Sequence, residues 1–201
     1  MERLPDTNPA AVRRFWAAID AGGLVVYPTD TLYGMGVAAQ DQAALERLTH
    51  LKDRPGPFSV MVGRYEQLNE YALISPPLAV KLSHMLPGPF TFLLPARDPD
   101  SLPLSVMGPG GRIGCRVPEH RFLREAYALR SDLVVTTSVN LSGEPPIQDP
   151  DLIANRFGDD LDLLIDGGVL PPSLGSTLVD TNSDPWQILR PGDGLVPDHH
   201  E

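Results

Sequence analysis

Four groups of polar and charged side chains follow apolar runs of this sequence, at points where strands of a sheet are expected to end. Active sites of α/β proteins gather at such strand ends. Hydroxyl and amide side chains there can orient a small polar ligand, and the planar fork of arginine matches phosphate or carboxylate oxygens. The groups are Thr29, Asp30 and Thr31; Lys52 and Arg54; Thr136, Thr137, Ser138, Asn140 and Ser142; and Arg112, Arg116 and Arg190. The last three arginines could converge on an anion.

Each group also has a purely structural explanation. Asp30 and the threonines beside it can hydrogen-bond the local backbone in a turn. Lys52 can complement the C-terminus of a helix, although this explains less well why Arg54 stands beyond that helix. The run of hydroxyl and amide residues at 136–143 is also typical of an ordinary turn. Taken one at a time, the four groups therefore leave a structural and a functional interpretation open.

The elements that must position these groups can be predicted from the spacing of apolar residues. Helices are expected over 8–21 with Asn8 as a cap, from Asp41 as a cap, from 75 up to Pro87, over 119–129 and from 149. Strands are expected at 24–27, 58–62, 90–94, 113–117, 133–137, 163–166, 177–180 and 187–190. Helices interleaved with short strands indicate an α/β domain, with helices packed on a sheet. The last strands have no helices between them, so the sheet should be mixed parallel and antiparallel.

Composition narrows the class of protein further. The chain has 201 residues, 42% of them hydrophobic, which is enough for a substantial core. We expect one domain over 1–201, with its core at about 8–195 and a polar tail at 196–201. No apolar run of membrane-spanning length and no secretory signal is recognisable. A single cysteine fits a reducing cytoplasm, and a net charge of −10 argues against extended contact with nucleic acid.

Several common kinds of site are missing from the sequence. There is no P-loop motif, no G-x-S-x-G motif and no zinc-ligand spacing. The stretch 108–111 contains a proline and is expected to be a surface turn. Cys115 lies within a predicted strand and is expected to be a buried structural thiol, and His84 and His120 are expected to be structural. No bound metal site is predicted.

Read together, the polar groups and their flanking residues resemble the YrdC/TsaC family, the threonylcarbamoyl-AMP synthases. The first block below and the combination of K-x-R with S-x-N are specific, and the other blocks are weaker individually. The segments occur in the family's order and cover roughly residues 8–195. They are Tyr27–Gly36, Lys52–Pro55, Leu86–Thr91, Ile113–Pro118, Ser138–Gly143, Ser176–Asp180 and Ile188–Gly192.

The resemblance implies a single YrdC-like domain, in which a twisted sheet bears a large basic cavity on one side. It also implies how the cavity is shared between two substrates. Threonine would be bound by Thr31, Arg116, Thr136 and Ser176. ATP would be bound by Lys52, Arg54, Ser138, Asn140 and Arg190. Lys52 and Arg54 would be the catalytic cations, and Mg2+ would accompany ATP.

The activity implied by the resemblance is that of a cytoplasmic nucleotidyltransferase. It would form threonylcarbamoyladenylate and pyrophosphate from L-threonine, bicarbonate and ATP, as the first step of N6-threonylcarbamoyladenosine modification of tRNA. The product would pass to a separate tRNA threonylcarbamoyl-transferase complex. No contact with a membrane is expected.

One departure from the family pattern keeps alternatives open. Only Gly56 and Pro57 separate Pro55 from the next strand, whereas many relatives carry a longer polar insert there that touches phosphate. Short loops also occur in paralogues, so a non-catalytic nucleotide-binding or RNA-binding paralogue is the main alternative. A carbamoyl-adenylate-forming enzyme with another acceptor is the second.

Overall fold

The computed structural model describes residues 1–197. Within them the helices are α1 Ala11–Asp20, α2 Gln42–Lys52, α3 Leu68–Tyr71, α4 Pro76–Ser83, α5 Arg121–Leu129 and α6 Pro150–Phe157. The strands are β1 Glu2–Pro5, β2 Val25–Tyr27, β3 Gly34–Gly36, β4 Ser59–Met61, β5 Phe90–Pro95, β6 Met107–Gly108, β7 Arg112–Arg116, β8 Val134–Ser138, β9 Leu163–Asp166, β10 Thr177–Asp180 and β11 Gln187–Arg190. The predicted α/β class is confirmed.

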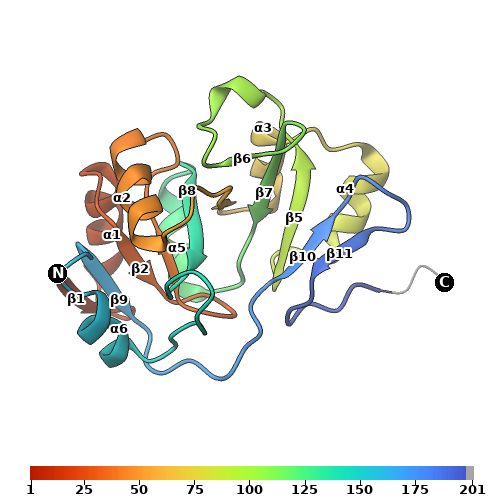
Figure 1. Cartoon of the computed structure of the whole chain (residues 1–201). Helices are drawn as coiled ribbons and strands as arrows, with labels where there is room; N and C mark the ends of the chain where they lie inside the picture. Colours follow the sequence, from red (N-terminus) through yellow and green to blue (C-terminus); the bar gives the residue numbers. More distant parts are fainter. Residues whose placement is uncertain (198–201) are drawn as a thin grey trace.

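The strands form one mixed sheet that runs across the whole structure (Figure 1). Their order is β1-β9-β2-β3-β8-β4-β7-β5-β10-β11, and β6 pairs with β7. The sheet contains parallel pairs, such as β4 with β7 and β5 with β10, and antiparallel pairs, such as β5 with β7. β8 lies near the middle and is antiparallel to both β3 and β4. The mixed sheet expected from the sequence is therefore present.

Helices cover both faces of the sheet, and alternate strand residues divide the core accordingly. In β2, Val25 and Tyr27 belong to the core cluster that contains the apolar residues of α1 and α5, whereas Val26 belongs to the cluster that contains those of α2, α3, α4 and α6. Successive side chains of a strand point to opposite faces, so a strand covered on both sides is apolar throughout. This explains the continuous apolar run at 24–27.

β1, β3 and the two-residue β6 have no clear signal in the sequence. β3 is Gly34-Met35-Gly36, and glycine disfavours strands. The glycines are needed because a Cβ at Gly36 would lie 2.2 Å from the backbone oxygen of Val135, and one at Gly34 would lie 2.7 Å from the Tyr27 ring. β1 is a short edge strand with polar residues and a terminal proline, and it pairs only with β9 among the described strands.

The predicted start of the first helix was wrong by one turn. Asn8 accepts a hydrogen bond from the Ala10 N–H at 2.8 Å, and Ala10 is the residue that precedes α1. Asn8 therefore closes a turn before the helix instead of capping it. By contrast, Asp41 caps α2 as predicted, because its side chain accepts from the Ala44 N–H at 3.0 Å.

The described part of the chain ends at residue 197. Of the predicted polar tail at 196–201, residues 198–201 lie outside the described residues, and Val196 packs partly buried against the core. Across residues 1–197, none of the helices has the length and apolar character needed to cross a bilayer.

Candidate active site

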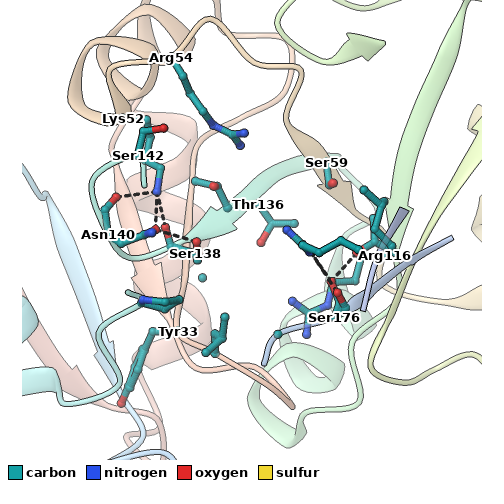
Figure 2. Close-up of a pocket in the computed structure, with 18 of the residues that line it drawn as sticks. Tyr33, Lys52, Arg54, Ser59, Arg116, Thr136, Ser138, Asn140, Ser142 and Ser176 are labelled. Carbon is teal, nitrogen blue, oxygen red and sulfur yellow. Dashed lines mark hydrogen bonds between the residues drawn. The ribbon is translucent and has the colours of Figure 1, made fainter. Parts of the chain in front are cut away.

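A cavity of about 400 Å³ opens between the central strand β8 and the strands β7, β10 and β11. Figure 2 shows its walls: Lys52, Ser138 and Asn140 lie on one side, Arg116 and Ser176 on the other, and Thr136 lies between them. Arg54 comes from a third direction (Figure 2). The lining therefore combines segments that are far apart in the sequence.

The sheet places three of these side chains on a common face. Ser59 of β4 pairs with Thr136 of β8, and Met61 of β4 pairs with Arg116 of β7. Residues two apart on a strand share a face, as do direct cross-strand partners, so Ser59, Thr136 and Arg116 point the same way. Gly114 keeps this face open, since a Cβ there would lie 2.9 Å from the Ser59 hydroxyl oxygen.

Lys52 anchors the first wall. It is the last residue of α2 and only 2% exposed. Its ammonium donates to the backbone oxygens of Ser138, at 2.8 Å, and Asn140, at 2.6 Å, and to Asn140 Oδ1 at 2.7 Å. Burial, together with the charge of Arg54, lowers the pKa of Lys52 to about 8, while the three acceptors favour its charged form.

Arg54 leaves the helix because α2 ends in a left-handed residue. Asp53 has a φ of 49°, which turns the chain out of the helix directly before Arg54. The Arg54 guanidinium lies 4.8 Å from the centre of the Phe58 ring, and its buried Nε has no hydrogen-bond partner among the described residues. Burial lowers the pKa of Arg54. Arg54 thus brings a cation with unused donors to the cavity.

Arg116 defines the second wall. Its Nη2 donates to the hydroxyls of Thr29, at 3.1 Å, and Thr31, at 2.6 Å, and pairs with Asp30 at 2.5 Å. The Arg116 and Asp30 side chains are 9% and 11% exposed. The buried Nε of Arg116 has no hydrogen-bond partner in residues 1–197. The loop before β3 therefore holds one edge of the guanidinium and leaves other donors for a ligand.

Arg190 and Ser176 complete this wall. Arg190 Nη2 donates to the Ser176 backbone oxygen at 3.1 Å, and the Ser176 hydroxyl lies 2.7 Å from that of Thr91. Burial and the charges of Arg116 and Arg54 lower the pKa of Arg190. The charge of Arg190 is therefore disfavoured by its surroundings, and a bound anion would relieve this.

Hydrogen bonds of Asp193 join the chain segment that carries Ser176 to the segment that carries Arg190. Asp193 accepts hydrogen bonds from the Ser173 hydroxyl, at 2.5 Å, and the Leu174 N–H, at 2.9 Å. Gly192 lies where the two segments are in close contact, because a Cβ on Gly192 would be 2.4 Å from the Gly175 backbone oxygen. The glycine of the Arg190-Pro191-Gly192 segment is therefore required for close backbone contact.

The charge of the lining contrasts with that of the whole chain. Lys52, Arg54, Arg116 and Arg190 all line the cavity, and Glu144 is the one carboxylate found among its described lining residues. Glu144 is itself paired with Arg156 at 2.6 Å. A protein with a net charge of −10 thus concentrates cations at one pocket, which suits a small ligand that carries several negative charges.

The structure brings together most of the residues singled out in the sequence. Every residue that the resemblance assigns to a substrate, except Thr31, lines the cavity, and Thr31 contacts Arg116 from behind it together with Thr29 and Asp30. Arg112 does not join the other arginines, because it pairs with Asp180. Arg112 and Arg116 are four positions apart along β7, about 13 Å at the usual rise per residue.

Two hydroxyl residues of the lining were not predicted as site residues. Ser59 is a polar residue within the apolar run Phe58–Val62, and Thr91 follows Phe90 at the start of β5. In both cases a hydroxyl residue inside an otherwise apolar strand is the sequence feature that could have indicated a site residue. Cys115, in contrast, is fully buried as predicted.

The side chains of the cavity also determine whether the protein itself could hold a metal ion. In the part of the chain that the structure describes, no three His, Cys, Asp or Glu side chains are grouped so as to hold a metal ion. A cavity lined by cations and hydroxyls suits a magnesium ion that is held mainly by the phosphates of a nucleotide. Glu144 is the lining residue whose carboxylate could add a ligand.

These features define an α/β protein with a polar, cation-lined substrate cavity. The model of the Sua5/YciO/YrdC family, described as "telomere recombination", matches residues 17–192. The chain belongs to this family. The threonylcarbamoyl-AMP synthase of Pyrococcus abyssi is 32% identical over 177 residues, which are 87% of this chain and 52% of the relative.

Solved structures agree with this assignment. P. abyssi Sua5, in a complex with L-threonine, has a TM-score of 0.82 and 30% identity, covering 95% of this chain and 56% of that one. E. coli YciO has a TM-score of 0.85 at 24% identity, covering 97% and 95%, and at that identity the likeness shows the fold alone. The chain spans about half the length of the Pyrococcus relatives it matches.

Proposed function

We propose that the protein forms threonylcarbamoyladenylate and pyrophosphate from L-threonine, bicarbonate and ATP. The observation that carries this proposal is the pairing of a buried arginine, held by threonine hydroxyls, with two further arginines and a hydroxyl-rich turn across one cavity. An amino acid with its carboxylate on Arg116 and a nucleotide phosphate beside Arg54 and Arg190 would satisfy the unused donors. A relative of 30% identity is known as a complex with L-threonine.

The substrates divide between the two walls. Arg116, Thr136 and Ser176 would bind threonine, with the carboxylate on the guanidinium, and Thr31 would act by holding that guanidinium from behind. Arg54, Ser138, Asn140 and Arg190 would bind ATP. Lys52, expected from the sequence to contact ATP as a catalytic cation, has all three of its protons in hydrogen bonds to the protein. It would reach a phosphate directly only by giving up one of them.

The chemistry then needs positioning and charge stabilisation but no covalent enzyme intermediate. The amine of threonine adds to CO2 derived from bicarbonate and loses a proton, giving an N-carboxylate. An oxygen of this carboxylate forms a bond to the α-phosphorus of ATP, and the bond from that phosphorus to the bridging oxygen breaks to release pyrophosphate. Negative charge gathers on the phosphate oxygens, and Arg54 and Arg190 are the cations available to stabilise it. Mg2+ would shield the phosphates that bind it.

The cellular setting follows from the same proposal. The product would be used by a tRNA threonylcarbamoyl-transferase complex, and the protein would work in the cytoplasm. The acidic surface outside the cavity makes a direct, extended contact with tRNA unfavourable.

The test is pyrophosphate release by the purified protein, with threonine and bicarbonate each present or omitted. Release that requires both compounds supports the proposal and shows that the short loop at Gly56 and Pro57 is tolerated. Release that is indifferent to threonine, or no release at all, would refute it. A nucleotide-binding paralogue would then bind ATP in a direct titration without turning it over.

A further inference from the structure

The ammonium of Lys52 is directed at the protein and not at the open cavity. Its three hydrogen bonds, of 2.6 to 2.8 Å, all end on the turn at Ser138 and Asn140. A lysine ammonium has three protons, so its donors are fully used in the ligand-free protein. Figure 2 shows these bonds as dashed lines, with the Arg54 side chain lying apart from them.

The turn that receives these bonds is built around the same centre. Asn140 Oδ1 accepts from Lys52 and also from the Ser138 hydroxyl at 2.7 Å. The Asn140 side-chain nitrogen donates to the Glu144 backbone oxygen at 2.6 Å. One buried cation therefore fixes two carbonyl groups and one amide side chain. Without it, three acceptors would converge on an empty space.

Arg54 provides the contrast. It lies two residues further along and lines the same cavity, yet its Nε has no partner among the described residues and its guanidinium lies over the ring of Phe58. A cation that binds an anionic ligand has N–H donors that are unpaired in the ligand-free protein, whereas the donors of a cation that orders a turn are already paired with that turn. The two cations of the K-x-R segment thus have different environments.

We propose that Lys52 is a positioning residue, which orders the turn at 138–140 so that Ser138 and Asn140 can contact the nucleotide, and that it makes no direct contact with phosphate. This inference rests on the proposed function for the nature of the ligand. The part of the inference that concerns the ordering of the turn is independent of the proposed function, because that ordering is a property of the ligand-free protein. The two parts can therefore be tested separately.

The first experiment is hydrogen exchange of the 138–144 amides without any ligand, in the wild type, Lys52→Met and Arg54→Met. Loss of three buried acceptor contacts should speed exchange in Lys52→Met by about tenfold or more, with Arg54→Met within about twofold of the wild type. Far-UV circular dichroism checks that both variants are folded. Unchanged exchange in a folded Lys52→Met protein would overturn the proposal.

The second experiment uses Lys52→Arg, which keeps the charge but replaces the compact ammonium with a planar fork. If residue 52 contacted phosphate directly, arginine could replace lysine. Arginine cannot reproduce the three hydrogen bonds that the Lys52 ammonium donates to Ser138 and Asn140. We expect the dissociation constant for ATP to rise about tenfold, with that for threonine within about twofold of the wild type. ATP affinity equal to that of the wild type, together with unchanged exchange at 138–144, would contradict the positioning role. If the wild type binds no ATP, the proposed function fails, and the exchange experiment still decides the role of Lys52.

Discussion

Replacing Arg116 should have two separable consequences, one for stability and one for binding. The Arg116 and Asp30 side chains are 9% and 11% exposed and lie 2.5 Å apart, so they form a buried ion pair. The other Asp30 oxygen is buried and has no hydrogen-bond partner among the described residues. In Arg116→Met the Asp30 carboxyl group would be left in a buried position with no cation beside it. Breaking a buried pair in this way costs about 3–5 kcal/mol of unfolding free energy.

The effect on threonine is estimated from the contact that is lost. A hydrogen bond to a charged group is worth about 1.5–3 kcal/mol, which corresponds to a loss of affinity of roughly tenfold to a hundredfold. The double variant Arg116→Met with Asp30→Asn removes both charges from the buried pair. It should recover most of the lost stability, while threonine affinity stays low. ATP affinity should remain close to that of the wild type in both proteins, because Arg116 is assigned to the threonine side.

Chemical denaturation and calorimetric titration with threonine measure the two quantities, with Asp30→Asn alone as the matched control. If the double variant regains threonine affinity along with stability, Arg116 is a structural residue and not the carboxylate anchor. If Arg116→Met is as stable as the wild type, the pair is not buried in solution, and the estimate above rests on the wrong environment.

Three further predictions concern other parts of the site and the core. Arg54→Ala should lower turnover by about a hundredfold or more, the loss typical of removing an electrostatic donor; normal pyrophosphate release by a folded variant would remove Arg54 from the mechanism. Burial raises the pKa of the Cys115 thiol to about 12, so at pH 8 the native protein should resist iodoacetamide and Cys115→Ser should stay active; rapid alkylation without unfolding would contradict this. Tyr33→Phe should lower the unfolding free energy by about 1–3 kcal/mol, since its hydroxyl donates to the Gly168 oxygen and accepts from the Gly167 N–H; an unchanged denaturation midpoint would count against that contact.

The features that could be predicted from the sequence are those with a local cause. The Asp41 cap, the apolar face of α5 and the buried strand at 24–27 follow from neighbouring residues alone. β3 could not be predicted, because its glycines are explained by the backbone of β8 and the ring of Tyr27, which are distant in sequence or on another strand. Local propensity favours a turn there, and tertiary packing overrides it.

The same distinction applies to the site. Residue types identified the cations and hydroxyls, and the family resemblance grouped them, but neither indicates which cation is already paired. The resemblance gives Lys52 and Arg54 the same role, and they differ in the structure because the turn at Ser138 folds back onto α2 and accepts hydrogen bonds from Lys52. Arg112 and Arg116 look like a pair, yet they lie at opposite ends of β7. Pairing over long sequence separations determines these outcomes.

The central place of β8 links substrate binding to the completion of folding. Its two neighbours, β3 and β4, join the N-terminal part of the sheet to the part that carries Arg116 and Arg190. A partly folded chain that lacked either neighbour would have no cavity, so substrates can bind only the finished native state. A substrate present at a hundred times its dissociation constant would then raise the unfolding free energy by about 2.7 kcal/mol. A higher concentration of substrate would thereby lower the fraction of molecules that is unfolded and open to proteolysis.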